Sequence, residues 1–116
     1  MKKTLYGIPN CDTVKKARTW LAEHGIDATF HDFKKQGLDQ ATVQRWLDVL
    51  DWETLVNRKG TTWRNLPDAR KAAVTDKASA LELVLESPSV VKRPVLDRGG
   101  NFSVGYSEPQ YAAYFP

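Results

Sequence analysis

A single cysteine, Cys11, is present among the 116 residues, so the chain cannot form an internal disulfide bond. No apolar run approaches the length of a membrane-spanning helix. The first residues carry positive charge but no apolar segment of the kind that signal peptides contain, so we expect no signal peptide. A lone thiol without an export signal fits a reducing compartment, and we therefore predict a cytoplasmic protein that has no membrane partner.

Strong charge of one sign is also missing. Lys and Arg number 17 and Asp and Glu 14, which gives a formal net charge of +3 and a pI of about 9.1. The bases are scattered and no aromatic-and-basic RNA motif occurs, so we expect no nucleic acid partner. A modest positive field instead favours small anionic ligands. Metal-ligand spacing and glycine-rich phosphate loops are absent too, so we expect no metal and no bound cofactor.

The composition is nevertheless sufficient for a compact core. Hydrophobic residues make up 41% of the sequence, and four tryptophans supply large packing units. The length suits one compact domain rather than two independent ones.

The stretch around Cys11 predicts a strand, a tight loop and a helix. An apolar strand pattern ends at Tyr6, and Gly7 and Pro9 then interrupt regular structure. After Asn10, apolar residues recur at the spacing of one helix face. We therefore expect Cys11 in the first turn of a helix, with Asn10 as the N-cap.

This position has a chemical consequence for the thiol. The first N–H groups of a helix lack internal partners and the helix dipole places partial positive charge there, so a thiolate is stabilised. Asn10 and Thr13 can form local hydrogen bonds beside it, or can simply cap the helix. The alternative is an inert Cys11, because a free cysteine often behaves as a small apolar residue.

The remaining pattern predicts strand–helix–strand, then a helical segment, then strand–strand–helix. The first helix should stop at Gly25, and residues 26–33 alternate apolar and polar side chains as a half-buried strand does. Residues 34–86 have a helical pattern, with Asp39 as a cap and a polar loop over residues 57–64.

Residues 87–116 predict a hairpin and a terminal helix. A strand region over residues 90–97 is interrupted by Pro94, and residues 98–101 form a turn rich in glycine. Ser107 then begins the terminal helix.

This order, with Cys11 at the first helix start, resembles the thioredoxin fold, an α/β fold in which the proline matching Pro94 is cis. A core made of residues 1–33 and 87–116, with a helical insertion over residues 34–86, is similar to the arsenate reductase-like (ArsC/Spx) family. The resemblance covers essentially the whole chain.

Two stretches resemble one branch of that family in particular. Residues 6–17, Tyr-Gly-Ile-Pro-Asn-Cys-Asp-Thr-Val-Lys-Lys-Ala, and residues 105–108, Gly-Tyr-Ser-Glu, look most like the YffB branch. Each motif alone is weakly specific, but their combination at this separation is specific.

The resemblance also implies the site residues. The family's nucleophilic cysteine falls on Cys11. The residues expected to bind the substrate or an anion beside it are Arg93, Arg58, Asn10, Thr13 and Pro94. For the two arginines the alternative is an ordinary surface role, because most arginines are solvated or in exposed ion pairs.

Two departures from the family pattern limit what the resemblance implies. Glutathione-coupled arsenate reductases carry a third arginine at the place that holds Gly105, and a serine of theirs falls on Val14. Val14 also stands where many Spx regulators have a second cysteine. Arsenate is therefore a weaker expectation than thiol chemistry, and a Cys-x-x-Cys switch is excluded.

A lone cysteine restricts the mechanism independently of any family. A mixed disulfide on Cys11 must be resolved by another thiol, and this chain offers none. Glutathione is the abundant cytoplasmic thiol, and its two carboxylates suit the planar forks of two arginines. We therefore predict a glutathione-dependent thiol–disulfide oxidoreductase, with glutathione as cosubstrate and a small disulfide or oxyanion as substrate.

Two alternatives remain open. In one, the protein is a glutathione-coupled arsenate reductase in which Cys11 attacks arsenic. In the other, it is a non-enzymatic regulator that binds RNA polymerase, as the Spx proteins do, and the insertion over residues 34–86 provides a surface for a protein partner.

Overall fold

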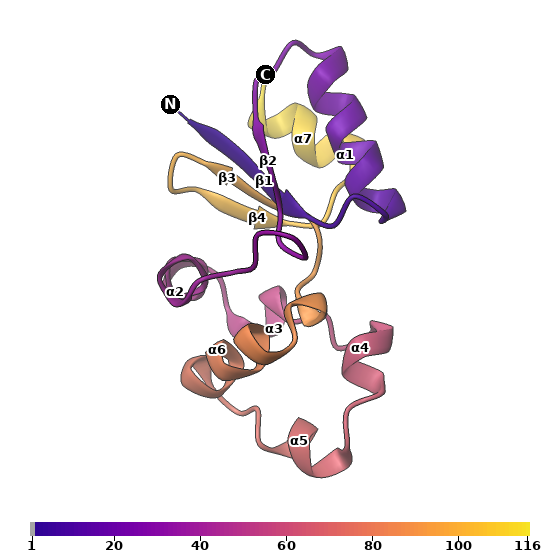
Figure 1. Cartoon of the computed structure of the whole chain (residues 1–116). Coiled ribbons are helices and arrows are strands. Elements are labelled where there is room, and N and C mark those ends of the chain that lie inside the picture. The colour runs from indigo at the N-terminus through magenta and orange to yellow at the C-terminus, as the bar shows by residue number, and fades with distance from the viewer. Residues whose placement is uncertain (1) are drawn as a thin grey trace. The chain divides into compact units, whose positions relative to one another are not determined.

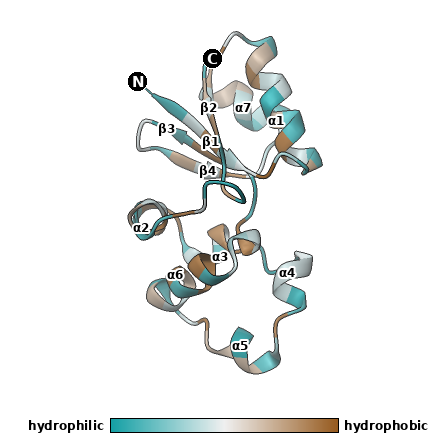
Figure 2. Ribbon diagram, viewed as in Figure 1, coloured by the Kyte–Doolittle hydropathy of each residue, from teal (hydrophilic) through white to brown (hydrophobic). Residues whose placement is uncertain are grey.

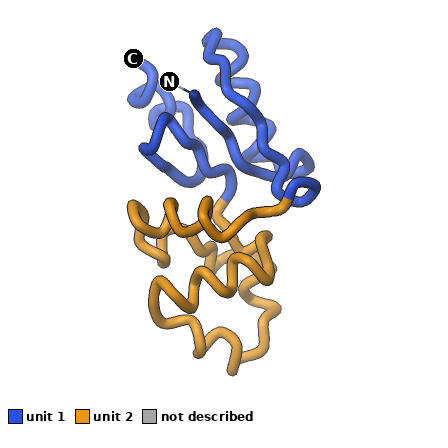
Figure 3. Tube along the Cα trace, turned by 60° about the vertical axis from the view of Figure 1, so that its left-hand side comes forward, with its two compact units in different colours: residues 1–36, 93–116 blue, residues 37–92 orange. Residues whose placement is uncertain are grey.

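The computed structural model describes residues 2–116. Along the chain (Figure 1) the elements are β1 (Lys3–Gly7), α1 (Asp12–Glu23), β2 (Thr29–Asp32), α2 (Gln40–Val49), α3 (Trp52–Leu55), α4 (Thr61–Arg64), α5 (Asp68–Ala72), α6 (Lys77–Glu86), the 3₁₀ turn η1 (Pro88–Val90), β3 (Val95–Arg98), β4 (Phe102–Val104) and α7 (Glu108–Tyr114). They form two compact units, one of residues 1–36 and 93–116 and one of residues 37–92 (Figure 3).

The first unit contains a four-stranded mixed sheet in the order β2-β1-β3-β4. β1 and β2 are parallel, whereas β3 is antiparallel to both β1 and β4. The predicted strand–helix–strand and strand–strand–helix order is therefore confirmed. It is the order of a thioredoxin-like α/β fold.

Helices α1 and α7 pack on one face of this sheet. Leu5 of β1 and Leu96 of β3 are register partners, and they belong to one buried cluster with Trp20 of α1 and Tyr111 of α7. The rings of Trp20 and Tyr111 meet edge to face at 5.7 Å. The core of this unit thus ties the helix that follows Cys11 to both neighbouring strands.

The sequence predicted the end of α1 correctly and the start of β2 incorrectly. Gly25 follows the helix with φ of 67°, a left-handed conformation that favours glycine. The expected strand over residues 26–33 pairs only from Thr29 to Asp32, because the amide of Ile26 bonds the carbonyl of Leu21 at 2.9 Å. This bond ties the beginning of the segment to α1 instead of to β1.

The second unit is helical, as expected, and hydrophobic and hydrophilic residues alternate along its helices (Figure 2). Asp39 caps α2 by accepting a hydrogen bond from the amide of Thr42 at 2.7 Å. Asp76 caps α6 in a reciprocal capping box with Ser79. Hydrogen bonds from Ser79 hold the pKa of Asp76 below its usual value.

Two features of this unit differ from the prediction. The expected polar loop over residues 57–64 contains α4, which begins after Gly60. The residues before Arg93 also pair within the helical unit, because Val91 bridges Val56 and the amide of Lys92 bonds the carbonyl of Leu55 at 2.8 Å. The helical unit consequently ends at Lys92, beyond residue 86, where the insertion was expected to end. Within residues 2–116 no helix is long and apolar enough to cross a membrane.

Candidate active site

Cys11 is the N-cap residue of α1, a half-buried free thiol with extended backbone, φ −125° and ψ 124°. Its carbonyl accepts the first helical hydrogen bond, from the amide of Lys15 at 2.9 Å. Asn10 is exposed and precedes the cap, so the prediction that Asn10 is the N-cap was wrong by one residue. The prediction was wrong because it relied on the preference for Asn at N-caps. The N-cap is the residue whose carbonyl accepts the first helical hydrogen bond.

This placement brings the sulfur to the positive end of α1. The Cys11 side chain makes no capping hydrogen bond, so it does not satisfy the amides of the first turn. The helix dipole then interacts favourably with an anionic sulfur. Thr13 lies half-buried in the first turn, and Asp12 is the one acid there.

Pro94 occupies the end of the sheet nearest the loop that carries Cys11. The Arg93–Pro94 peptide is cis, as the resemblance implied. Tyr6 is the register partner of Val95, so Pro94 is next in line beside Gly7, where β1 ends. The carbonyl of the buried Pro94 accepts a hydrogen bond from the amide of Gly105 at 2.9 Å.

Arg93 precedes this proline and is half-buried. Among residues 2–116 its side chain makes no hydrogen bond and no ion pair. The guanidinium therefore has its fork of donors available for an external anion.

Arg58 belongs to the second unit and is exposed. It forms an ion pair with Glu53 at 3.2 Å and lies 5.4 Å from the ring of Trp52. With Lys59 and Lys92 it lines a depression of about 300 Å³. Glu53 thus partly neutralises the charge of Arg58. A role for Arg58 at Cys11 stays a prediction from the resemblance.

The comparisons with known proteins agree on one family. The sequence model of the ArsC family matches residues 6–114. The chain belongs to the ArsC family.

Its relatives within the family differ in what their names say. A solved structure named YFFB is 49% identical, has a TM-score of 0.93, and covers 99% of this chain and 100% of its own. An arsenate reductase (ArsC) related protein from Brucella melitensis is 57% identical, with a TM-score of 0.78 and coverage of 99% and 95%. The global transcriptional regulator Spx of Streptococcus agalactiae is 24% identical over 115 residues, 97% of this chain and 82% of its own.

Gly105 occupies the position where the resemblance to glutathione-coupled arsenate reductases implies a third arginine. Gly105 is buried and has φ of 74°, in the left-handed region. A side chain at this position costs about 1–2 kcal/mol of backbone strain. The backbone itself, and not only the missing charge, separates this chain from the three-arginine pattern.

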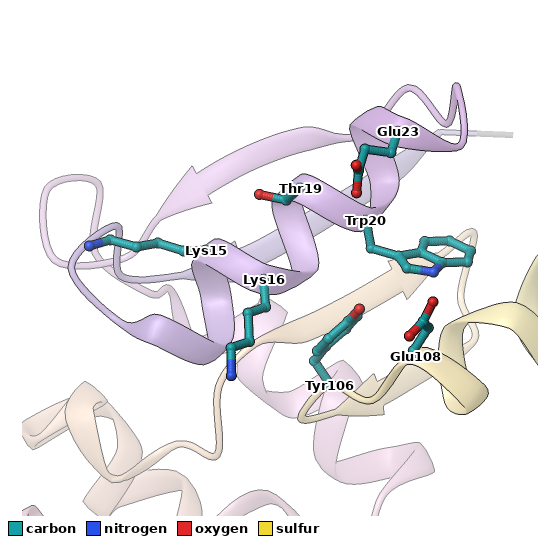
Figure 4. A pocket seen from close by; sticks show the side chains of 7 residues that line it. All are labelled: Lys15, Lys16, Thr19, Trp20, Glu23, Tyr106 and Glu108. Carbon is teal, nitrogen blue, oxygen red and sulfur yellow. The ribbon is translucent and has the colours of Figure 1, made fainter.

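Sequence reasoning missed a pocket of about 460 Å³ between α1 and the segment after β4. Figure 4 shows Trp20, Glu23, Tyr106 and Glu108 around it. The residues of α1 and those after β4 lie far apart in the sequence, and neither segment carries a motif that predicts a pocket. In the described part of the chain no group of three His, Cys, Asp or Glu side chains could hold a metal ion.

Proposed function

We propose that this ArsC protein is a glutathione-dependent thiol–disulfide oxidoreductase with Cys11 as its nucleophile. The observation that carries the proposal is a single free thiol at the start of α1, beside the sheet end that holds the cis Pro94. A thiolate there is stabilised by the helix terminus, and a lone thiol needs an external partner to complete a cycle.

The reaction has two exchange steps. The Cys11 thiolate attacks the glutathione sulfur of a mixed disulfide R–S–S–G, the S–S bond breaks, and R–S⁻ leaves and takes up a proton. A second glutathione thiolate then attacks the same glutathione sulfur on Cys11, which regenerates the Cys11 thiolate and forms oxidised glutathione. The substrate disulfide is reduced and two glutathione molecules are joined, so atoms and electrons balance.

Arg93 is proposed to hold a glutathione carboxylate while Cys11 reacts. A guanidinium binds a carboxylate with two parallel hydrogen bonds, and Arg93 spends no donor on another described residue. Arg58, Asn10 and Thr13 complete the proposed set on the basis of the family resemblance. We place the reaction in the cytoplasm, where the glutathione pool is kept reduced.

The decisive experiment is intact-mass measurement after incubation with oxidised glutathione. We expect the wild type to gain the mass of one glutathione and to lose it when reduced glutathione is added. Cys11→Ser should gain nothing. A wild-type protein that never acquires the adduct would contradict the proposal.

Arsenate reduction is the second candidate, because the Brucella melitensis relative carries that name at 57% identity. It ranks lower because Gly105 cannot supply a third arginine to surround a multiply charged oxyanion. A regulator of the Spx type ranks third, since the position of its second cysteine is occupied by Val14.

A further inference from the structure

The pocket beside α1 has an aromatic wall and an acidic far end. Trp20 of α1 is buried and Tyr106 is half-buried, and their rings form the wall. The carboxylates of Glu23, from the last turn of α1, and Glu108, from the first turn of α7, point toward that wall (Figure 4). Within residues 2–116 neither carboxylate is in an ion pair.

Both walls of this pocket lead to the reacting cysteine. One wall is α1, whose N-cap is Cys11. The other wall begins at Gly105, whose amide bonds the carbonyl of Pro94, and Tyr106 follows directly. A peptide disulfide that reacts at Cys11 therefore has this pocket as an adjoining cavity of the same unit.

The charges along the pocket change sign with distance from Cys11. Lys15 and Lys16 line it about one helical turn from the cysteine. Glu23 lies twelve residues beyond Cys11, about 18 Å along the helix axis. Burial first, and then Glu108 and Glu23, raise the pKa of Tyr106, which indicates that both carboxylates act on its hydroxyl group.

We propose that this pocket binds the peptide portion of the disulfide substrate, and that it selects a chain with a basic side chain several residues from the reacting cysteine. The lysine or arginine of the substrate lies near Glu23 and Glu108, against the half-buried ring of Tyr106. This inference rests on the thiol–disulfide function proposed above, and it names the substrate class: glutathionylated peptides or proteins with a nearby basic residue.

The length of the pocket supports a peptide over glutathione alone. An extended chain spans about 3.3–3.6 Å per residue, so about five residues are needed to cover the distance from Cys11 to Glu23. Glutathione carries one residue on each side of its cysteine and ends short of the acidic end. Lys15 and Lys16 repel a basic side chain close to the cysteine, so the preferred basic residue is a distant one.

The chemistry of the far end supports a cationic side chain. Unpaired carboxylates attract an ammonium or guanidinium group, and an aromatic face adds a cation–π interaction. Exposed charge pairs are individually weak, so each carboxylate should change the rate by roughly two- to fivefold. The effect should also diminish with added salt, because exposed charges are screened.

The test uses glutathionylated peptides that differ at one position. The first peptide has Lys five residues from its cysteine, the second has Glu at that position, and the third has Lys directly beside the cysteine. Each peptide is made in two versions, with the variable residue before or after the cysteine. We expect the wild type to reduce the first peptide with a kcat/KM five- to tenfold above the others. The double variant Glu23→Gln/Glu108→Gln should bring the three within about twofold.

A matched variant controls for the loss of charge. Glu82→Gln removes an exposed carboxylate from α6 of the other unit and should retain the full preference. Equal rates for the three peptides with wild-type protein would overturn this inference and leave the thiol–disulfide function standing.

A binding measurement separates the two proposals. Fluorescently labelled peptides with Ser in place of cysteine are titrated with the Cys11→Ser protein, so no exchange can occur. Tighter binding of the distant-Lys peptide, abolished by Glu23→Gln/Glu108→Gln, supports the pocket even if Cys11 proves unreactive. Identical anisotropy curves for the basic and acidic peptides would refute it, whatever the outcome of the glutathione experiment.

Discussion

Arg93 places a guanidinium directly before the cis proline at the end of the sheet where β1 leads to Cys11. It differs from the other proposed arginine in its surroundings, because Arg58 is already paired with Glu53. A free guanidinium offers two parallel donors to a carboxylate, whereas a lysine offers one compact charge. A lysine at position 93 therefore separates the effect of the paired hydrogen bonds from the effect of the positive charge.

We predict that Arg93→Lys lowers kcat/KM for glutathione roughly ten- to hundredfold, because hydrogen bonds to charged groups contribute about 1.5–3 kcal/mol and one of two is lost. Arg93→Ala should lower it further. The measurement is the coupled oxidation of NADPH through glutathione reductase at varied glutathione concentration. Arg64→Lys, on the exposed α4, is the control and should have wild-type kinetics. Unchanged kinetics in Arg93→Lys would show that Arg93 contributes its positive charge and not two parallel hydrogen bonds.

Gly7 and Val14 show how one element fixes another at the cysteine. A methyl group built on Gly7 would meet Val14 Cγ2 at 2.8 Å and Cγ1 at 3.1 Å. Val14 is fully buried in the first turn of α1. The end of β1 and the start of α1 are thus in direct contact, and this contact sets where the loop between them presents Cys11.

We predict that Gly7→Ala lowers the free energy of unfolding by about 1–3 kcal/mol, because it overpacks this contact. Val14→Ala should cost a similar amount by leaving a cavity. In the double variant the added methyl group enters the space that Val14 vacates, so the loss should fall short of the sum by at least about 1 kcal/mol. Urea unfolding measures all three proteins, and strictly additive losses would show that the contact does not form.

Elements with strong local signals were predicted from the sequence. The end of α1 depends on Gly25, the hairpin turn on two glycines with positive φ, and α7 on Ser107, which accepts a hydrogen bond from the amide of Gln110 at 3.2 Å. β2 and α4 were predicted poorly, since their bounds depend on backbone hydrogen bonds that no local pattern specifies. Capping and turn residues thus mark some ends of elements locally, whereas the bounds of β2 and α4 depend on hydrogen-bond partners.

The same distinction applies to the site. Cys11 and the cis Pro94 could be identified because each lies in a short motif. The pocket could not, because Trp20 and Tyr106 come to line one cavity only after the left-handed turn at Gly105 leads the chain from β4 to α7. A cavity made by segments almost ninety residues apart has no signature in either segment alone.

The whole molecule combines an ArsC sequence with a reduced set of anion-binding groups. Its net charge is only +3, and Gly105, where the resemblance to glutathione-coupled arsenate reductases implies a third arginine, has a backbone that favours glycine. Arsenate carries more than one negative charge, and its reduction requires groups that stabilise the charge that develops on it. A disulfide bond is neutral, and its reduction requires a thiolate, here with Arg93 proposed to hold a carboxylate of glutathione.

We therefore predict that the protein reduces a glutathionylated peptide with a kcat/KM at least about tenfold above that for arsenate, which corresponds to a difference of about 1.4 kcal/mol in the barrier. Both reactions are followed through NADPH oxidation by glutathione reductase, with the same enzyme concentration and glutathione supply. Cys11→Ser should abolish both, which shows that the signal comes from the same thiol. Arsenate turnover equal to disulfide turnover would contradict this prediction, and arsenate turnover above it would reverse the order of the two candidate functions.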